Sequence, residues 1–466
     1  MLSFTRLENF GHSLSATCFL AQPENVEQIA DLFRLARRKG TTITLRGGGR
    51  SYNDAALNGG GIVLDLSRMN RILEWDPQRG VLRAEPGVTL QQVWQRVLPD
   101  GWWPPVVSGT MFTTLGGCLA ANIHGKNNYH AGTIGEHVLE FRAFLPSGAE
   151  VTCSPNHNAD LFYALIGGLG LLGVFTSITL QMKRVHSGLL EVHAWPVHNL
   201  EEHLASLHSN APEYDYIVGW LDATAAGRGL GRGQIHAARH LPPGADAQAE
   251  RTRQLEYQQL PSTILGIFPK SLMPWLMRPF MQNWSVALVN SGKYLLGLRR
   301  QRYLQPHAAF HFLLDYIPAW ERAYGRHGLI QYQSFLPKET AAEVWREMLR
   351  LSQKHGFPSY LGVTKRHRPD AFLLSHGVDG FSLALDFKVP DRRRAEMHGL
   401  LQIFDRLVVE AGGRFYFAKN SETNAATTRQ FLGEEAVRRF RTLKKRCDPD
   451  HVLESDLYRR IFGSQD

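Results

Sequence analysis

The stretch Leu45-Arg46-Gly47-Gly48-Gly49-Arg50-Ser51-Tyr52-Asn53-Asp54 decides how the rest of the sequence is interpreted. It follows a short β-like run, Thr41–Leu45, and a second apolar run, Gly61–Leu66, comes soon after. Three consecutive glycines free the backbone from Cβ constraints, so their amides can turn toward a ligand. Successive free N–H groups form a concavity that suits phosphate, and the flanking arginines add positive charge. The stretch therefore predicts a loop that holds an anionic, diphosphate-type group, although a flexible surface turn would have the same composition.

Two further glycine-bearing stretches favour the ligand interpretation. Thr113–Asn122 is rich in small residues, and a helix there would let a flat ligand approach closely and would offer its N-terminal amides to phosphate. Gly168-Leu169-Gly170-Leu171-Leu172-Gly173 matches G-x-G-x-x-G, but a helical pattern precedes it and the strand-like run Val174–Val185 follows it. The dinucleotide fingerprint requires a strand first and a helix second. A Rossmann fold is therefore disfavoured, and a different glycine-rich nucleotide cradle is expected.

The composition is that of an ordinary soluble globular protein, with 466 residues, 43% hydrophobic and 20% charged. The four cysteines are scattered and show no CxxC spacing, which argues against disulfides, against a zinc site and for a reducing compartment. Met1–Asn9 contains no apolar signal core and no window is long enough for a membrane span, so we expect a cytoplasmic protein. The net charge of +9 favours anionic partners such as phosphates, acidic lipid headgroups or nucleic acid. No nucleic-acid-binding motif is found, so nucleic acid is not expected as a partner.

Hydrophobic periodicity predicts both helices and strands along the chain. Helices are predicted at Val26–Arg38, Leu90–Leu98 with Thr89 as N-cap, Glu339–His355 and Glu434–Arg446. Alternating strands are predicted at Phe310–Tyr316, Gly328–Leu336, Tyr360–Lys365 and Phe381–Phe387, and Ala225–Arg253 reads as an exposed connection.

Pro261–Leu296 is apolar and amphipathic but interrupted by four prolines. Part of the protein core, a flap over a lipidic substrate and a membrane-surface contact all fit this pattern. The prolines argue against a regular core helix.

Taken together, these stretches resemble the flavoprotein family of vanillyl-alcohol oxidase and p-cresol methylhydroxylase. More closely, the chain resembles the group that oxidises decaprenylphosphoryl-β-D-ribose at its 2′-hydroxyl. The likeness covers nearly the whole chain in the same order. The motifs that carry it are Arg46–Tyr52, Glu85–Leu90, Ser108–Thr110, Gly116-Gly117, Ile123–Asn127, Gly167–Gly173, Gln331–Gln333, Gly413–Lys419, Asp448-Pro449 and Ser455-Asp456.

The resemblance implies an α+β, two-domain fold of the vanillyl-alcohol oxidase type. An FAD-binding domain would comprise residues 1–192 completed by 410–466, and residues 193–409 would form a substrate-binding domain with an antiparallel sheet. Many relatives link FAD covalently through a histidine where this chain has Arg50, so we expect non-covalent FAD. The FAD-binding residues implied are Arg46, Gly47, Gly48, Gly49, Arg50, Ser51, Tyr52, Ser108, Gly109, Thr110, Thr114, Gly116, Gly117, Asn122, His124, Gly125, Gly170, Gly173, Val174 and Tyr416.

The resemblance also assigns the reaction chemistry. Lys419 would stand near the flavin and the sugar, where a cation stabilises developing negative charge; by its sequence alone it would be a solvated surface lysine. His124 would position flavin or substrate, or be a structural histidine; the histidines near it in sequence fit no standard zinc spacing, and no metal is expected. Asp386 would be a general base or a structural partner of Lys419. The substrate-binding residues implied are Gln331, Gln333, Lys365, Lys419 and Tyr52, whereas plain strand or core positions are the alternative.

The expected activity is FAD-dependent oxidation of a polyprenylphosphoryl-β-D-ribofuranose to its 2-keto sugar, the first half of an epimerisation to arabinose. A short-chain reductase would complete it, and a peripheral contact with the inner membrane would supply the lipid-linked substrate. Mycobacterial members carry cysteine and asparagine where this chain has Ala384 and Ser382, so the pocket is altered. The alternatives are a soluble sugar-lactone or alditol oxidase on the same fold, and a basic binding protein without redox activity.

Overall fold

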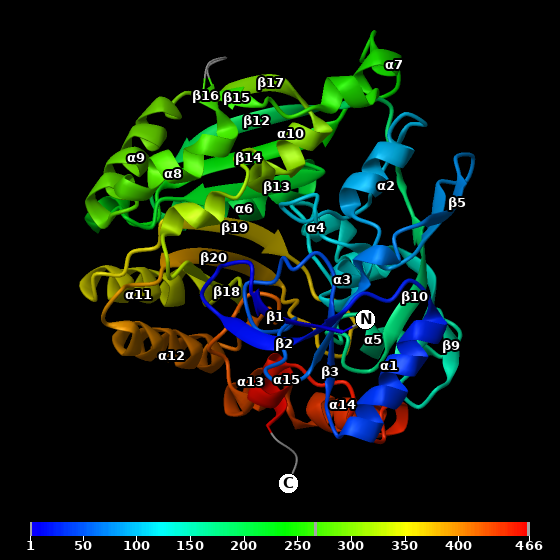
Figure 1. The fold of residues 1–466 in the computed structure, drawn as a ribbon. Coiled ribbons are helices and arrows are strands. Elements are labelled where there is room, and N and C mark those ends of the chain that lie inside the picture. Colours follow the sequence, from blue (N-terminus) through cyan, green and yellow to red (C-terminus); the bar gives the residue numbers. More distant parts are fainter. Residues whose placement is uncertain (1, 265–267, 464–466) are drawn as a thin grey trace.

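Three sheets of four, five and eight strands organise the chain, as the computed structural model shows for residues 2–264 and 268–463 (Figure 1). The eight-stranded sheet takes up the green-to-orange part of Figure 1, and the two smaller sheets take up the blue and cyan part. The red C-terminal helices lie beside the blue N-terminal elements. This mixture of helices with largely antiparallel sheets agrees with the expected α+β class.

The four-stranded sheet presents the glycine loop. Its order is β1 (Ser3–Glu8), β2 (Ser15–Ala21), β4 (Ile62–Asp65), β3 (Ile43–Arg46), with β4 parallel to both β2 and β3. Helix α1 (Val26–Lys39) connects β2 to β3; the Asn25 side chain caps its start, and Gly40 at φ 59° ends it. The apolar side of α1 packs on this sheet. The glycine loop starts directly where β3 stops.

The five-stranded sheet is antiparallel throughout. Its order is β5 (Ile72–Asp76), β6 (Val81–Ala84), β10 (Val174–Gln181), β8 (Val138–Phe144), β9 (Glu150–Cys153). Thr89 is the N-cap of helix α2 (Leu90–Val97), as predicted, and it forms a capping box in which Thr89 and Gln92 bond each other's backbone amides. The remaining elements of this region are α2 (Leu90–Val97), α3 (Leu115–Ala120), α4 (Asn128–Ala131), α5 (Ala159–Leu165) and the short pair β7 (Trp102–Trp103) and β11 (Lys183–Arg184).

The eight-stranded sheet is antiparallel and has two different faces. Helices α6 (Leu200–Asn210), α11 (Ala341–Lys354) and α12 (Arg394–Glu410) pack on one face, where His203 bonds Thr364 and Trp345 bonds Ser334. Because side chains alternate along a strand, the neighbouring residues Gln333 and Lys365 lie on the opposite face. The strand order is β17 (Gln301–Pro306), β12 (Leu189–Val197), β14 (Gly233–His240), β13 (Tyr216–Leu221), β19 (Leu361–His367), β20 (Gly380–Lys388), β18 (Leu329–Pro337), β21 (Arg414–Phe415).

The C-terminal segment returns to the N-terminal sheets. After α13 (Ala425–Leu432) and α14 (Glu434–Cys447), Leu453 forms a parallel bridge with Ile43 of β3, and α15 (Asp456–Phe462) follows. Buried Lys444 donates to Asp448 Oδ2 at 2.6 Å and to the Leu171 carbonyl at 2.9 Å. These bonds tie the last helices to the G-x-G-x-x-G loop.

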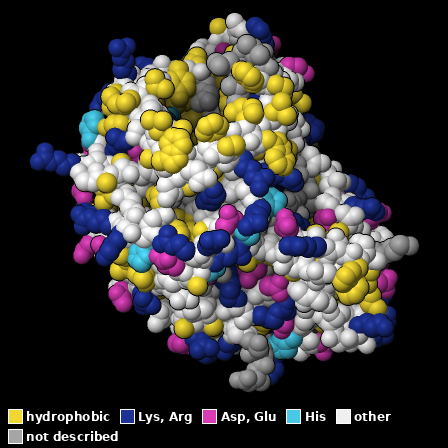
Figure 2. Space-filling model, turned by 60° about the vertical axis from the view of Figure 1, so that its left-hand side comes forward, with side chains coloured by type: hydrophobic (Ala, Val, Ile, Leu, Met, Phe, Trp, Pro, Cys, Tyr) yellow, Lys and Arg dark blue, Asp and Glu magenta, His cyan; other side chains and the backbone are white. Residues whose placement is uncertain are grey.

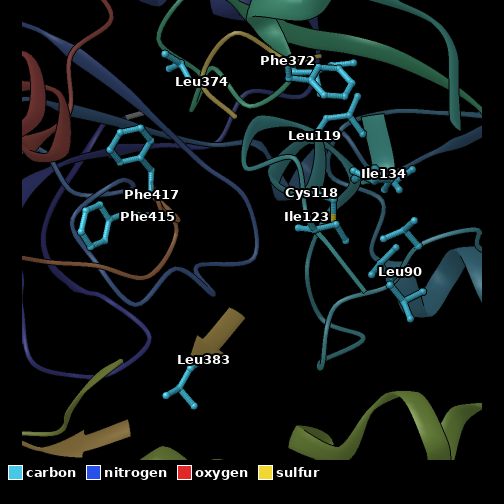
Figure 3. Packing of buried hydrophobic residues seen from close by; sticks show 14 of the residues in the cluster. Leu90, Cys118, Leu119, Ile123, Ile134, Phe372, Leu374, Leu383, Phe415 and Phe417 are labelled. Carbon is cyan, nitrogen blue, oxygen red and sulfur yellow. The ribbon is translucent and has the colours of Figure 1, made fainter. Parts of the chain in front are cut away.

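One hydrophobic cluster joins the regions. Figure 3 shows Cys118, Leu119, Ile123 and Ile134 around α3, and the same cluster includes Phe372, Leu383, Phe415 and Phe417 from the part of the chain beyond residue 370. Ile123, which precedes His124, is thus held by packing from both sides.

Two sequence interpretations are wrong. Phe310–Tyr316 is not a strand: α10 (His307–His311) and a 3-10 turn, Leu313–Asp315, occupy it, because Trp103 packs against both His307 and His311, one helical turn apart. Ala225–Arg253 is not merely an exposed connection, because the buried strand β14 lies within it; α7 (Ala249–Thr252) follows.

The core interpretation of Pro261–Leu296 is also wrong for most of its apolar residues. The described part forms β15 (Thr263–Ile264), β16 (Phe268–Pro269), α8 (Met273–Met277) and α9 (Asn283–Leu296). Met281 and Val286 face inward, but Trp284 is 69% and Leu296 84% exposed. Figure 2 shows hydrophobic side chains gathered on one face at the top of the molecule. We call the following residues the exposed apolar face: Phe268, Leu272, Trp275, Leu276, Phe280, Trp284, Leu288, Val289, Leu295 and Leu296.

Within the described residues, no helix combines the length and apolarity needed to cross a membrane.

Candidate active site

The glycine loop is pressed against a second loop of the N-terminal part. A Cβ at Gly47 would meet the Thr114 hydroxyl at 2.1 Å, and one at Gly48 would meet the Phe112 carbonyl at 2.4 Å. Gly49 has φ +63°, in the left-handed region that favours glycine. The Arg50 guanidinium carbon lies 5.2 Å from the centre of the Phe10 ring and 5.4 Å from that of Phe112. Glycine is therefore required here by close backbone approach.

The second loop, residues 108–114, leads into α3, whose first backbone amides are not free, contrary to the prediction. The Leu115 and Gly116 amides at the start of α3 donate to the carbonyls of Val88 and Pro86 at 2.7 and 2.8 Å. These amides are therefore not available to phosphate, and that part of the prediction is wrong. Gly116 is needed because a Cβ there would lie 2.7 Å from Pro86.

The hydroxyls of this loop are also engaged by protein. Ser108 Oγ donates to the Thr110 carbonyl at 2.8 Å, and Thr110 Oγ1 donates to Asp315 at 2.6 Å. Asp315 also accepts the Met111 amide at 2.7 Å, and the Gly109 carbonyl accepts the Leu314 amide. The segment around Asp315 is thus bound directly to the predicted cofactor loop.

The remaining predicted cofactor residues are spread around the same region. Arg46 donates to the Glu8 carbonyl at 3.2 Å, and Gly170, at φ +72°, lies against Leu45. Asn122 Oδ1 accepts the Gly135 amide at 3.0 Å. The Val174 side chain is fully buried in the α1–β4 core, so this position can face a ligand with its backbone alone. The Ser51 carbonyl accepts the Phe10 amide at 2.9 Å, and the Gly117 amide donates to Thr114 Oγ1 at 3.3 Å. A Cβ at Gly125 would meet Asn127 at 2.4 Å, and one at Gly173 would meet Leu145 at 2.8 Å.

Unsatisfied buried atoms test whether a flavin nucleotide fits these residues. Arg50 Nε, Tyr52 Oη and Asn122 Nδ2 are buried and have no hydrogen-bond partner in the described part of the chain. Such orphaned atoms are costly unless a ligand or water satisfies them. Together with the close-packed glycine loop, they fit an anionic, hydrogen-bonding cofactor.

The predicted substrate residues meet on one face of the eight-stranded sheet. In register, Gln331 lies opposite Asp386, Gln333 lies opposite Ala384, and Lys365 lies opposite Ser382. Ala384 and Lys365 are part-exposed although β20 and β19 are central strands, whereas Thr364 on the other face is fully buried. This face is therefore not closed by packing.

His124 is buried where the N-terminal part meets this face. Its Nδ1 lies 3.4 Å from Lys365 Nζ, and its Nε2 lies 3.1 Å from the Gln333 amide. An ammonium group only donates, so Nδ1 accepts from Lys365, while Gln333 presents its side-chain nitrogen to Nε2. Burial and neighbouring Lys365 hold the pKa of His124 well below its usual value, so the ring is neutral.

Lys419 is held between the two parts of the molecule. Its Nζ lies 3.9 Å from the centre of the buried Tyr52 ring. The Tyr52 backbone amide donates to the Ala418 carbonyl at 3.0 Å, and the Gln333 backbone amide donates to the Asn420 side-chain oxygen at 3.2 Å. The loop after the glycines and strand β18 thus fix Lys419 from opposite sides.

Asp386 and Lys419 influence each other's protonation. Burial raises the pKa of Asp386 to about 6, against the effects of its hydrogen bond from Gln331 and of Lys419. Burial lowers the pKa of Lys419 to about 7, while Asp386 opposes the shift. Gln331 donates to Asp386 Oδ1 at 2.5 Å, and Asp386 Oδ2 is buried without a hydrogen-bond partner among the residues described. The Asp386 carboxyl therefore has a pKa close to neutral pH, and its Oδ2 has no hydrogen-bond partner among the described residues.

The sequence did not indicate two histidines that line the same spot. The His367 ring centre lies 4.8 Å and the His376 ring centre 5.3 Å from that of His124. The ring of Tyr416, predicted to lie near the flavin, is tilted by 51° against that of His376, with 4.5 Å between the ring centres. No local motif surrounds His376, and only its three-dimensional position singles it out.

Comparisons with known proteins identify the family of this chain. The family described as "FAD binding domain" matches residues 18–154. Decaprenylphosphoryl-beta-D-ribose oxidase of Mycolicibacterium smegmatis is 31% identical over 98% of this chain and 97% of its own length. An uncharacterised protein of Streptomyces coelicolor is 30% identical over 80% of this chain and 100% of its own, and L-gulonolactone oxidase of Mus musculus is 29% identical over 42% and 43%. The chain therefore belongs to the decaprenylphosphoryl-β-D-ribose oxidase family of FAD-dependent oxidoreductases, within the p-cresol methylhydroxylase-type FAD-binding proteins.

Proposed function

We propose that this protein oxidises the 2′-hydroxyl of a polyprenylphosphoryl-β-D-ribofuranose to the 2-keto sugar. The full-length likeness to decaprenylphosphoryl-beta-D-ribose oxidase supports the substrate class. The observation that carries the chemistry is the free, buried Oδ2 of Asp386 beside Lys419, on the open face of the sheet. The product is the first intermediate of an epimerisation, which a short-chain reductase would complete to the arabinose form.

In this proposal Asp386 and Lys419 manage the proton and the charge. Bound FAD supplies the acceptor for the hydride that leaves the sugar carbon. Asp386 Oδ2 accepts the hydroxyl proton, because it is the unpartnered oxygen and its raised pKa suits a general base near neutral pH. Lys419 stabilises the negative charge that develops on the sugar oxygen.

The neighbouring side chains bind and orient the sugar. Gln331 keeps the Asp386 carboxylate in place, and Gln333 and Lys365 present polar atoms to the sugar hydroxyls. His124, fixed by two of these residues, positions them rather than carrying a proton, because its pKa is too low for a charge at neutral pH. Tyr52 supports Lys419 through its ring face.

We further propose non-covalent FAD in a two-domain arrangement. The FAD domain comprises residues 1–192 and 410–466, and the substrate domain residues 193–409; the bridge from Ile43 to Leu453 supports the first grouping. Strand β21 pairs with β18 and so links the two domains. Arginine at position 50 offers no bond to flavin of the kind a histidine makes, so acid precipitation of the pure protein is expected to release all of its flavin into the supernatant.

The proposal also includes a peripheral contact with the cytoplasmic side of the inner membrane. The exposed apolar face would enter the headgroup region, and the exposed Arg278, Arg299 and Arg300 would meet acidic lipids. The variant Trp275→Ser/Trp284→Ser is expected to lose binding to vesicles that contain phosphatidylglycerol. Equal sedimentation of variant and wild type with vesicles would contradict this contact.

Product analysis tests the activity itself. The holoenzyme is incubated with farnesylphosphoryl-β-D-ribofuranose and an artificial electron acceptor, and the product is reduced with borodeuteride. Deuterium at C2 of both ribose and arabinose is the expected result. If small lactones or alditols are oxidised and the prenylphosphoryl sugar is not, the lactone-oxidase alternative is favoured. The shorter match to L-gulonolactone oxidase is consistent with that alternative.

A further inference from the structure

The open sheet face does not stop at the sugar-binding residues. Trp220 of β13 pairs in register with Val363 of β19, and Gln234 of β14 pairs with Trp220. These residues share the face of Gln333 and Ala384, because register partners point the same way. The face therefore continues across two more strands.

Helix α9 lies over this continuation. The Lys293 ammonium lies 4.0 Å from the centre of the Trp220 ring, and the Lys293 carbonyl accepts the Gln234 side chain at 3.0 Å. Further along the helix, Ser291 accepts from Arg232 at 2.9 Å. The helix is thus anchored to the ends of β13 and β14, and the exposed Lys293 reaches the Trp220 ring with its ammonium group.

A second cation approaches the same place from the N-terminal part. Lys126 Nζ bonds the Phe310 carbonyl and lies 4.3 Å from the centre of the Phe310 ring. His236, on β14, feels the charges of both Lys126 and Lys293, which together with burial lower its pKa to about 4. The Lys126 carbonyl accepts the Ile217 amide at 2.8 Å, so Lys126 lies beside the same stretch of β13 that pairs with His236 and Gln234. Burial, and after it the charge of Lys365, lowers the pKa of Lys126 to about 7.

These two lysines lack acidic counter-charges. In the described ranges no carboxylate lies within ion-pair distance of Lys126 or Lys293. Asp222 does raise the pKa of Lys293, but Arg232 holds that carboxylate at 3.0 Å. Cations that share one surface without an anion repel each other, and a bound anion relieves this repulsion.

We propose that Lys293 and Lys126, together with His236 on the same face of β14, form the subsite for the phosphodiester of the substrate. This inference rests on the proposed function. The sugar then lies over β18, β20 and β19, the phosphate lies under α9, and the polyprenyl chain leaves across the exposed apolar face. Leu288 and Leu296 on the outward side of α9 lie close to Lys293 along the same helix and continue the path.

The test measures binding of a non-reacting lipid phosphate to the FAD-loaded enzyme by calorimetry. Lys293→Met is expected to weaken the binding of geranylgeranyl monophosphate by about ten- to a hundredfold, because one charge-assisted contact is lost. The affinity of the same variant for geranylgeraniol, which lacks the phosphate, is expected to stay within about twofold of that of wild type. Lys293→Arg should retain most of the phosphate affinity. The matched control Lys354→Met removes an exposed lysine at the end of α11, on the opposite side of the sheet, and should change neither ligand.

Several outcomes would overturn the subsite. One is equal weakening of both prenyl ligands in Lys293→Met, and another is unchanged binding of the monophosphate. Inorganic phosphate that binds as tightly as the prenyl phosphate, with no gain from the chain, would also reject a lipid-phosphate site.

Kinetics separate this inference from the proposed function. If the ribosyl substrate turns over and Lys293→Met keeps the wild-type KM, the subsite is wrong and the function stands. If prenyl phosphate binding depends on Lys293 but no ribosyl substrate is oxidised, the function is wrong and the subsite stands.

Discussion

Two groups of lysines in this molecule have opposite surroundings, one fully buried and one part-exposed on the open sheet face. Lys444, near the C-terminus, is fully buried and bonds Asp448 and two backbone carbonyls. On the open sheet face, none of the described carboxylates forms an ion pair with Lys365, Lys126 or Lys419. Lys365 lies beside the neutral His124, Lys126 bonds one carbonyl, and Lys419 faces a tyrosine ring while Asp386 acts on it from beyond ion-pair distance. A buried charge that finds an anion inside the protein holds the fold together, whereas one left without an anion is costly unless a ligand supplies it. The comparison therefore separates structural lysines from ligand-binding ones.

Lys419→Ala would break the functional side of this comparison. We expect turnover to fall by about a hundred- to a thousandfold, because the charge that stabilises the developing oxyanion is lost. FAD content, measured as flavin absorbance per protein, should stay unchanged. Turnover like that of wild type would remove Lys419 from the mechanism.

Lys444→Met would break the structural side. We expect the free energy of unfolding in urea to fall by about 3–5 kcal/mol, because Asp448 is left buried without its partner. Turnover per folded molecule should be retained. The double variant Lys444→Met/Asp448→Asn should recover part of the loss; a single variant as stable as wild type would show that the pair is not structural.

Asp386→Asn sharpens the comparison by removing the carboxylate that acts on Lys419. Asp386 must be ionised to accept a proton, so wild-type kcat should rise with pH through the region of its pKa, about 6. In the variant this rise should vanish and kcat should fall by about a hundredfold. A variant that keeps the same pH profile would assign the base to another group.

Lys365→Met has the smallest expected effect. It should raise the free energy of unfolding, whereas Lys444→Met should lower it. Burial lowers the pKa of Lys365 to about 8, so its charge destabilises the fold. We expect the variant to gain about 1–3 kcal/mol of unfolding free energy at pH 7 in anion-free buffer. The folded pKa lies below the unfolded one, so wild-type stability should rise between about pH 8 and 10. That rise should be smaller in the variant, and a loss of stability comparable to that of Lys444→Met would contradict the distinction.

Local signals predicted the helices and the glycine loop well. Asn25, Thr89 and Gly40 end or begin helices through backbone bonds to near neighbours, so their effects can be inferred from sequence. Gln331, Gln333 and Asp386 could be suspected only through resemblance, because their meeting depends on strand register.

The errors came from long-range contacts. The α3 amides looked available because their acceptors, Pro86 and Val88, lie almost thirty residues upstream in sequence. Phe310–Tyr316 alternates like a strand, but packing against Trp103 makes it helical. Lys293 carries no signal of its own, and only the path of α9 brings it over Trp220.

The most direct measurement is the visible spectrum of the pure protein on addition of a polyprenylphosphoryl ribose without oxygen. The proposed function predicts a yellow protein whose oxidised-flavin band, at roughly 450 nm, bleaches with this substrate. In Lys419→Ala the bleaching should be slowed at the same flavin content. A flavin band that stays intact with the prenylphosphoryl sugar but bleaches with free lactones or alditols would contradict the proposed substrate class.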